Sequence, residues 1–552
     1  MKKYLIIVLP MLLAGVSAFG QGWQDAYLFS QNEYGGTARS MALGNAVTAL
    51  GGDPGTIGIN PAGSSVNSYS QFMFTSGLSI GNGWSVGTIA EGDTAPVGFS
   101  DEVSSHRTCF KVPNAGIIMN FDSGRRHGLK RMSFGFVMNS TADYTSRLNA
   151  SGVNANNSFG AFLGSYADGY STNVMANEAW DYVGDLTRMP PWIAMTAYRS
   201  GMISGVTGAD GAYISLSEVL DDAGNFRLAA PVFQRYGRQT AGGKQDWVMN
   251  FSANWDDKFF LGANLGITSV HYDMLEYWEE SPEVYSEFPV INYSDGTSAY
   301  FESMLMKRRF ILDGSGIYAK AGFIWVPLSG IRIGGAVQTP TVMDITEKYG
   351  YTGQTFLTGK NREAVSSPED HWGYDMVFPF RYNLGAAVTF GQFAILSADY
   401  EGVNYAQSRF RVPTGDEFGD YDSGMFDNQN QDIRAILGMS HSLRAGVEFK
   451  PAPGIAVRTG YNYITSGIKD GSEAAKQIVS FGLGYSSTGS FYADLALRFR
   501  FLPDEYIIPY YYYYAPDPTH FYDKVVDDGV MTPEIRFQSS VAEAMVTVGW
   551  RF

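Results

Sequence analysis

The sequence predicts an all-β protein, an antiparallel transmembrane β-barrel of about fourteen strands that follows a compact N-terminal segment. Three observations predict this fold. Many segments alternate apolar and polar residues with the period of two that a half-buried strand requires. The connections between them alternate between short and long, as in outer-membrane barrels, where short turns face the periplasm and long loops face outward. The chain also ends on an aromatic residue, Phe552, which closes an alternating strand.

Residues 1–20 have the pattern of a secretory signal peptide. A lysine pair precedes an apolar run from Tyr4 to Val16, and Ala18-Phe19-Gly20 forms a small-x-small cleavage site. We therefore expect the mature chain to start at Gln21. No later stretch offers about 18 consecutive apolar residues, so we expect no transmembrane helix.

Charge and cysteine content narrow the class of protein. The net charge is −16, and no basic stripe is present that could displace counterions from phosphates, so we expect no nucleic-acid partner. Cys109 is the single cysteine, which excludes an intramolecular disulfide. An exported chain without disulfides fits a bacterial envelope protein better than a secreted disulfide scaffold.

The most regular strand is Phe491–Phe501. Its odd-numbered positions form one apolar face, and its other face carries Asp494, Arg498 and Arg500. Periodicity alone would also suit a soluble sandwich, so the loops have to decide between the two. The other strands are expected at Tyr69–Ile80, His106–Phe121, Arg131–Ser140, Asp246–Trp255, Lys258–Tyr277, Tyr300–Trp325, Ile331–Ile345, Phe380–Phe390, Gln392–Glu401, Leu443–Lys450, Ile455–Tyr463, Gln477–Tyr485 and Val541–Phe552.

The connections favour the barrel, because a sandwich has no reason to alternate short and long ones. The short turns are Asp122–Lys130, Asp256-Asp257, Leu328–Gly330, Gly391, Pro451–Gly454 and Ser486–Ser490. The long loops are Gly81–Ser105, Thr141–Gln245, Trp278–Ala299, Thr346–Asp375, Gly402–Met439, Ser466–Lys476 and Leu502–Ser540. An even number of strands, which a closed bacterial barrel needs, places both chain termini on the periplasmic side.

The last strand carries a candidate assembly signal. Ala544, Val546, Val548, Trp550 and Phe552 share the face that would contact lipid. A terminal aromatic that closes such a pattern is similar to the signal recognised by the barrel-assembly machinery. We therefore expect Trp550 and Phe552 to act in assembly, with this machinery as a partner and outer-membrane lipids around the barrel.

The stretch Gly35–Gly63 is rich in small residues. It is expected to contain one short helix, with Leu43, Val47 and Leu50 on one stripe and four alanines on the next. Gly51-Gly52 ends the helix, and Asn60 is extended because it precedes a proline. We expect a compact knot that packs very close to a wall.

Placed just before a series of strands, this knot resembles the hatch of the FadL-type outer-membrane transporters of hydrophobic compounds. Their Asn-Pro-Ala signature is matched by Asn60, Pro61 and Ala62. The segment EYGGTARSMALGNAVTALGG is similar in sequence to family members from Bacteroidetes-like bacteria. The resemblance implies a fourteen-stranded, porin-like barrel (68–552) with a hatch (21–67) that plugs the lumen. It also implies passive uptake of hydrophobic small molecules or lipids, such as long-chain fatty acids. The glycines that flank the signature, Gly51, Gly52, Gly58 and Gly63, are the expected hinges of a hatch that moves.

The insertion at 141–245 is much longer than an ordinary loop, and we expect it to be structured and partly helical. Its aromatic residues include Trp180, Tyr182 and Trp192. They are expected either to form a landing groove for a hydrophobic ligand or to pack as a satellite core on the rim. The run Tyr510–Tyr514 in the last long loop is expected to belong to the interfacial belt.

Catalytic and metal sites are not indicated, and we expect no enzyme activity and no cofactor. The histidines are scattered without metal-ligand spacing. Ser440 and His441 are adjacent on an expected strand, so their side chains point to opposite faces and suit a nucleophile and base poorly. Charged residues on the inward face, such as Arg381, Arg444 and Glu401, are expected to pair across strands and fill the interior.

Two other functions stay open. Type IX secretion shuttle proteins share this barrel and receive protein cargo. A tightly sealed lumen and an exposed loop platform would favour this function. Some relatives carry a haemin-receptor label, which would require an axial histidine or tyrosine near the mouth.

Overall fold

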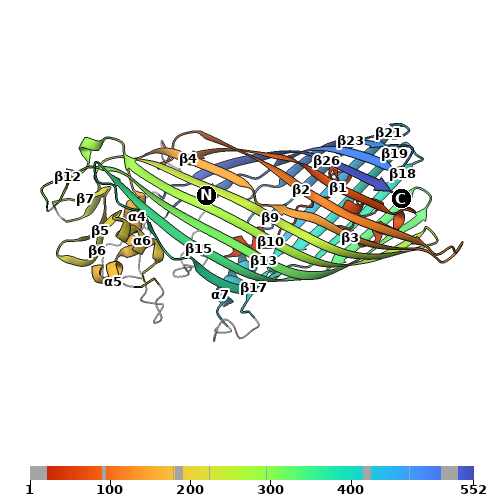
Figure 1. The fold of residues 1–552 in the computed structure, drawn as a ribbon, viewed down its shortest axis with the longest axis horizontal. Coiled ribbons are helices and arrows are strands. Elements are labelled where there is room, and N and C mark those ends of the chain that lie inside the picture. Colours follow the sequence, from red (N-terminus) through yellow and green to blue (C-terminus); the bar gives the residue numbers. More distant parts are fainter. Residues whose placement is uncertain are drawn as a thin grey trace.

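The computed structural model describes residues 22–89, 95–177, 179–180, 190–222, 224–293, 295–413, 424–471, 473–510 and 532–552. Within these residues the chain forms one long β-barrel (Figure 1). Short turns and the C-terminus lie at one end, here called the turn end. A cap of helices and short hairpins lies at the other end, the loop end, whereas the connection that carries α7 (Asp427–Ile436) lies beside the middle of the barrel (Figure 1). The signal peptide expected over 1–20 lies outside the described residues.

The predicted fourteen-stranded antiparallel barrel is confirmed. Each strand pairs with the next along the chain, and β1 pairs with β26 from Gln71↔Arg551 to Gly87↔Ile535, which closes the barrel. The strands are β1 (Gln71–Gly87), β2 (Val103–Asp122), β3 (Leu129–Asp143), β9 (Val232–Trp255), β10 (Phe259–Pro282), β13 (Phe301–Leu328), β14 (Ile331–Gln338), β18 (Arg381–Phe390), β19 (Ala394–Asn404), β21 (Met439–Ala452), β22 (Ile455–Ile464), β23 (Lys476–Ser486), β24 (Phe491–Phe501) and β26 (Ile535–Arg551).

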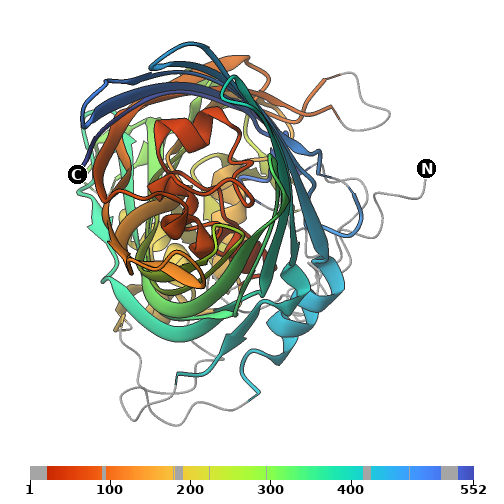
Figure 2. The ribbon, with the colours of Figure 1, turned by 90° about the vertical axis from the view of Figure 1, so that its right-hand side faces the viewer.

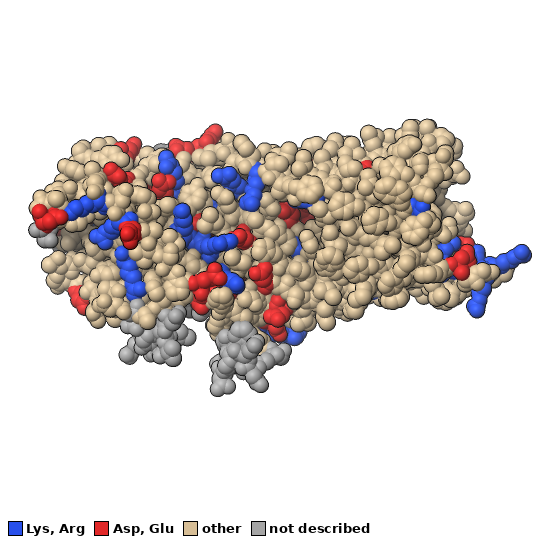
Figure 3. Space-filling model, viewed as in Figure 1, with Lys and Arg blue, Asp and Glu red and all other residues tan. Residues whose placement is uncertain are grey.

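The outward face of the barrel carries an apolar belt near the turn end. Few charges appear on that half of the surface, whereas the half toward the loop end is studded with them (Figure 3). Aromatic side chains gather at the turn end of the belt, at Phe121, Trp255, Trp325, Phe390, Phe449, Tyr485, Trp550 and Phe552. On β26, Ala544, Val546 and Trp550 are exposed, as the alternation predicts. No helix in the described ranges is long and apolar enough to cross a membrane.

Several strands continue toward the loop end beyond the predicted limits. The extensions are β4 (Ser146–Asn154), β15 (Thr341–Leu357), β16 (Val365–Ser366), β17 (Asp370–Phe378), β20 (Arg409–Arg411) and β25 (Glu505–Ile507). Most of Thr346–Asp375, expected to be a loop, is therefore strand. Pro340 and Pro379, which have no N–H to give, face each other where β14 passes into β15 and β17 into β18.

The insertion expected at 141–245 contains fewer loop residues than predicted, because β4 and the first half of β9 lie within this range and belong to the barrel. What remains is a cap over the loop end, built from helices and short hairpins (Figure 1). Its elements are α4 (Phe159–Ala167), α5 (Thr172–Asn177), α6 (Trp192–Ser200), β5 (Ile203–Val206), β6 (Ala209–Ser215), β7 (Glu218–Leu220) and β8 (Phe226–Leu228). Later loops add η4 (Tyr285–Glu287), β11 (Ile291–Asn292), β12 (Ser298–Ala299), η5 (Tyr405–Gln407) and α7 (Asp427–Ile436).

The closing strand leads to a prediction about assembly. Phe552 exchanges two backbone hydrogen bonds with Ser70, of 3.1 and 3.0 Å, and its ring is 68% exposed at the turn end. Phe552→Ala should lower the fraction of chain that reaches the folded barrel several-fold, because the last strand must pair with the first while it presents its aromatic end. The fraction that migrates as a compact species in unboiled gels measures it. Phe393→Ala removes another exposed ring, 70% exposed between β18 and β19, and is the matched control; equal losses in both variants would contradict a special role of Phe552.

Candidate functional site

The N-terminal segment lies inside the barrel (Figure 2), and we call it the hatch; that it plugs the lumen stays a prediction. It consists of α2 (Trp23–Ser30), α3 (Ala38–Ala42), η1 (Pro54–Thr56) and η2 (Pro61–Val66). The helix expected to run through Leu50 ends at Ala42, because Gly44 and Asn45 turn into the left-handed region with φ of 61° and 57°. Leu43, Val47 and Leu50 still share one buried cluster.

The hatch approaches the wall so closely that wall glycines meet its backbone. A Cβ atom on Gly446 would lie 2.6 Å from the carbonyl oxygen of Leu43, and one on Gly460 would overlap the backbone of Leu43 and Gly44. The wall glycines that leave room for hatch backbone are Gly262, Gly334, Gly446 and Gly460, and those that leave room for hatch side chains are Gly322, Gly385 and Gly482. The small residues of the hatch and of the wall therefore form one tightly packed contact.

The Asn-Pro-Ala signature fastens the hatch. The Asn60 amide donates to the carbonyl oxygens of Thr48 at 2.7 Å and of Phe323 on β13 at 2.9 Å, and its Oδ1 accepts the N–H of Ala62 at 3.1 Å. Pro61 presents its carbonyl to Asn250 at 2.9 Å. Ala62 is fully buried against wall side chains of β10 and β13. These residues tie the hatch to itself and to three strands, β9, β10 and β13.

The flanking glycines make the knot compact. Gly51 and Gly52 have φ of 61° and 76°, which disfavours other residues, and the N–H of Gly52 donates to the carbonyl of Gly63 at 2.8 Å. The carbonyl of Gly58 accepts Lys320 Nζ at 2.5 Å. Their role as hinges stays a prediction.

Wall side chains satisfy backbone groups of the hatch that have no partner within it. Lys244 Nζ donates to the carbonyls of Phe29 and Gln31 at 2.8 and 2.5 Å, and Arg332 donates to that of Leu50 at 2.6 Å. Asp399 accepts the N–H of Thr48 at 2.7 Å. Buried backbone polar groups in irregular segments need such partners, so the wall is matched to this hatch conformation.

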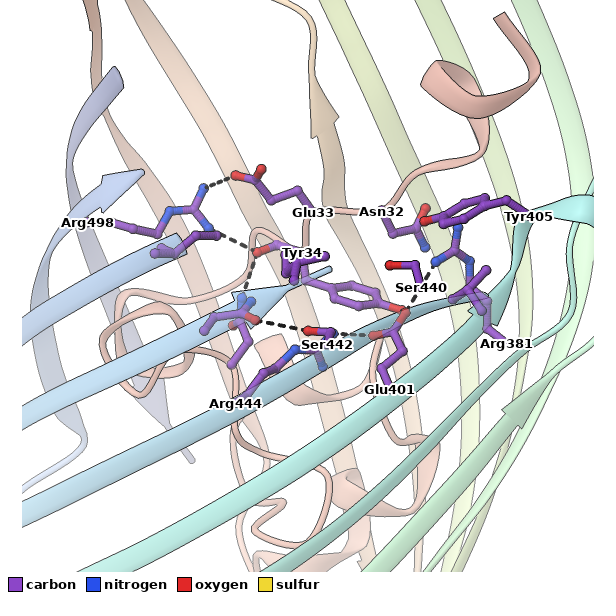
Figure 4. A pocket seen from close by; sticks show the side chains of 15 residues that line it. Asn32, Glu33, Tyr34, Arg381, Glu401, Tyr405, Ser440, Ser442, Arg444 and Arg498 are labelled. Atoms are coloured by element: carbon purple, nitrogen blue, oxygen red, sulfur yellow. Dashed lines mark hydrogen bonds and ion pairs between the residues drawn. The ribbon is translucent and has the colours of Figure 1, made fainter. Parts of the chain in front are cut away.

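Tyr34 is the centre of a contact that we call the Tyr34 latch, made of Tyr34, Arg381, Glu401 and Arg444 (Figure 4). Tyr34 Oη donates to Glu401 at 3.3 Å, and Glu401 also accepts from Arg381 at 3.2 Å and from Arg444. The Arg444 guanidinium lies 5.1 Å from the centre of the Tyr34 ring. Burial raises the pKa of Tyr34 above its ordinary value, so it stays a neutral donor. A cavity of about 30 Å³ lies between these groups.

Glu33, next to the latch, binds a second set of cations. Its carboxylate lies 2.7 Å from Arg500, 3.2 Å from Arg498 and 3.3 Å from Lys476. Burial alone would raise the pKa of Glu33, but these three cations hold it at about 2. The predicted pairing of inward charges is thus observed, and it includes hatch residues that the strand pattern alone did not identify.

Above the knot, toward the loop end, the lumen is lined by apolar and aromatic side chains. Phe29 of α2 packs among them, with its ring centre 5.6 Å from that of Tyr144 and 5.4 Å from that of Tyr272. Burial, together with the carboxylate of Glu347, raises the pKa of Asp25 on α2 to about 7. Barrel strands and the segment between β3 and β4 contribute Tyr144, Val270, Tyr272, Phe310, Leu312, Met343, Ile345, Tyr374, Met376, Phe378, Val403 and Phe410 to this lumenal apolar cluster, and the connection with η5 and α7 contributes Tyr405, Phe426, Ile433 and Leu437.

The predicted landing residues lie in the cap. Trp180 and Trp192 meet edge to face at 6.0 Å, Trp192 Nε1 donates to the carbonyl of Trp180 at 3.2 Å, and Arg199 lies 4.4 Å from the Trp180 ring centre. Both pack against the buried core of the cap. Tyr182 lies outside the described residues. These contacts suit a satellite core, and ligand landing stays a prediction.

Two chemical possibilities concern the described part of the chain, a metal-binding group and the Ser440–His441 pair. No group of three or more His, Cys, Asp or Glu residues is placed there to hold a metal ion. Ser440 Oγ donates to the carbonyl of Thr465 at 2.7 Å, whereas His441 Nδ1 lies 2.8 Å from Tyr400 Oη on the exposed face. The two side chains therefore diverge, as predicted.

Comparisons with known proteins return solved structures only. No protein-family model matches the sequence, and no curated protein does. The fold is similar to that of a FadL homologue from Pseudomonas aeruginosa, with 11% identity over 94% of this chain and 99% of that one and a TM-score of 0.49. It is also similar to the toluene transporters TbuX of Ralstonia pickettii (13%, 94% and 98%, TM-score 0.46) and TodX of P. putida (13%, 94% and 99%, TM-score 0.45).

Proposed function

We propose that this chain is a bacterial outer-membrane barrel through which hydrophobic compounds, such as long-chain fatty acids, pass passively under control of the hatch. The observation that carries the proposal is the lumenal apolar cluster, an aromatic and aliphatic lining inside a closed barrel, occupied by Ala26 and Phe29 of α2. Water-filled barrels have polar interiors. An interior of this kind suits an apolar solute.

The outer surface supports the membrane location. A closed barrel with an exposed apolar belt and an aromatic girdle would bury this belt in lipid, because exposed apolar surface of such extent is unfavourable in water. The turn end, with the C-terminus, then faces the periplasm. The predicted position of the N-terminus falls on residues outside those described.

Burial of an alkyl chain in the lumen would supply enough free energy to bind a hydrophobic solute. An alkyl chain that buries ten methylenes would gain about 8 kcal/mol at roughly 0.8 kcal/mol each, before the costs of ordering. To reach the lumenal apolar cluster it must take the place of Phe29. We infer that α2 and the Tyr34 latch move first, since the knot around Asn60 has hydrogen bonds to the wall on several sides.

A protein-cargo shuttle of the type IX kind is the second candidate. The ordered cap over the loop end, with a buried core of its own, is the kind of platform that would receive a protein. Haemin binding gains no support from two of the histidines, because His271 in the middle of β10 and His371 on β17 are exposed and lie beside the carboxylates of Asp313 and Glu369.

A polar substitution in the lumen tests the transport proposal. Leu312 is fully buried in the lumenal apolar cluster on β13. Leu312→Asn should slow uptake of a long-chain fatty acid by cells about tenfold, because an unpaired amide there costs on the order of 1–3 kcal/mol against an alkyl chain. Ser315→Asn, on the outward face of the same strand, is the control.

Uptake at the wild-type rate in Leu312→Asn cells would contradict the proposed route. If cells that lack the protein take up fatty acids and other apolar solutes normally while export of a cargo protein fails, the shuttle replaces the transporter. Replacing Trp180 and Trp192 together separates the two functions of the cap: weaker fatty-acid binding with intact assembly would support ligand landing.

A further inference from the structure

A second cavity, of about 630 Å³, opens at the turn end between the hatch and the wall. We call it the turn-end vestibule and define it by Arg39, Leu50, Arg332, Ile395, Lys450 and Arg551, which line it. It lies on the side of the knot opposite the lumenal apolar cluster, and Figure 2 shows the hatch from this end. A solute that passes the hatch would therefore enter this cavity next.

The vestibule has more cationic than anionic groups. Arg39, Arg332, Lys450, Arg458 and Arg551 line it, against Asp53, Glu448 and Asp494. The carboxylates are already engaged. Glu448 accepts from Arg39 at 3.0 Å and from Arg458 at 2.7 Å, Asp494 accepts from Arg458 at 2.5 Å, and Asp53 accepts from Thr37 at 2.7 Å.

Two of the guanidinium groups have no carboxylate partner among the described residues. Arg332 donates through one nitrogen to the carbonyl of Leu50 at 2.6 Å. Arg551 donates to Ser486 Oγ at 2.8 Å, its Nε is buried without a partner, and its guanidinium lies 4.7 Å from the Tyr492 ring centre. Both side chains are half-buried, and a guanidinium that keeps free N–H donors at such a site is suited to a carboxylate or phosphate.

Apolar surface adjoins these cations. Leu50 and Val66 of the hatch and Ile395 of β19 line the same cavity. Leu50 belongs to a buried hatch cluster against which Ile395 packs. The vestibule thus offers guanidinium donors and an apolar wall side by side, which is the chemistry of an amphiphile with an anionic head.

We propose that the turn-end vestibule is a binding site for single-chain amphiphiles with an anionic headgroup, with Arg332 as its anchoring cation. The site receives the solute after the hatch and before release to the periplasm, so this inference rests on the proposed transport function. It also assigns a specificity: acids are retained at the exit, whereas neutral hydrocarbons and alcohols are not. Arg332 holds the hatch at Leu50 as well, so the bound headgroup lies where hatch and wall meet.

Photo-crosslinking of the purified full-length barrel in detergent tests the site. The probe is hexadecanoate with a diazirine close to its carboxylate, and labelled positions are read by mass spectrometry. We expect labels on vestibule residues such as Leu50 and Ile395. Arg332→Gln should reduce vestibule labelling about tenfold, as expected for the loss of one charge-assisted hydrogen bond, and Arg332→Lys should retain most of it.

Matched controls define the outcome. Lys130→Gln removes a cation at the same end of the barrel, one that pairs with Asp257 at 2.7 Å outside the vestibule, and should leave labelling unchanged. A second probe, hexadecanol with the diazirine at the same position, should label the lumenal apolar cluster but not the vestibule. Equal vestibule labelling by the alcohol, or by the acid in Arg332→Gln, overturns the proposal, and so does complete competition by millimolar inorganic phosphate, which would mean that the anion alone is bound.

The two proposals fail differently. Labels in the lumenal apolar cluster without labels in the vestibule overturn the exit site and leave transport standing. An absence of labels in both places removes the transport proposal, and the exit site with it.

Discussion

Gly460→Val is expected to displace the hatch from its contact with the wall and to turn a sealed barrel into a conducting one. A Cβ at this position would overlap the backbone of Leu43 and Gly44, and neither side can yield easily. Gly460 lies in the middle of β22, paired with Gly446 and Ser480, and Gly44 sits in a tight left-handed turn. Overpacking costs about 1–3 kcal/mol where side chains can adjust. Because two backbones collide here, we expect the upper end of this range or more.

Single-channel recordings in planar bilayers measure the effect, and the expected result is larger or more frequent conductance than in the wild type. Gly81→Val is the matched control. Gly81 also lies on a barrel strand, at an ordinary φ, but a Cβ there would come no closer than 3.8 Å to Arg107, the nearest residue. Unchanged conductance in Gly460→Val, with the compact gel band retained, would mean that the hatch does not seal the lumen.

The part of the fold that lies in the apolar belt could be predicted from the sequence. There the outward face is apolar and the inward face is polar. Strands such as Phe491–Phe501 and the closing strand can therefore be recognised in the sequence by their period of two. The same alternation identified the inward charges Arg381, Glu401 and Arg444. Their pairing follows from the cost of burying a lone charge.

The extensions toward the loop end escaped prediction because the polarity of the two faces reverses. On β15, Met343, Ile345 and Glu347 are buried inside, whereas Asp344 and Thr346 face out. An alternating segment with charges on its outer face does not look like a membrane strand, so Thr346–Asp375 was expected to be a loop. Pro340 and Pro379 interrupt the pairing of these strands only locally, because the strands stay paired on both sides of the prolines.

The partners of the hatch could not be predicted, because they are set by tertiary packing. Tyr34 and Glu401 are 367 residues apart, and nothing local in either segment marks the contact. Lys244 on β9 and Lys320 on β13 bind backbone carbonyls of the hatch, and a carbonyl partner cannot be recognised from the sequence because every residue carries one. The small residues of Gly35–Gly63 did predict close packing, since only glycine and alanine allow backbone to approach backbone.

The Tyr34 latch gives the second large expected effect. Glu401 balances two guanidinium groups, and Arg381, Arg444 and Glu401 are each no more than 5% exposed. Removal of one member of a buried ion cluster typically costs 3–5 kcal/mol, because the charges left behind cannot be solvated. Most of this cost should fall on the docked state of the hatch, since an undocked Tyr34 would let water reach both arginines.

Glu401→Gln should therefore accelerate hydrogen–deuterium exchange in residues 33–50 on the order of a hundredfold or more, with the barrel amides little changed. Adding Arg444→Met should recover part of the loss, because Arg381 then remains the one unbalanced guanidinium of the latch and still donates to the carbonyl of Ser30. Asp273→Asn is the control. It breaks an ion pair of the same kind at 3.0 Å, but Arg309 is 60% exposed there, and such surface pairs contribute about 0–1 kcal/mol. Equal exchange in Glu401→Gln and Asp273→Asn would mean that the hatch is held by its glycine contacts alone and that the latch charges only fill the lumen.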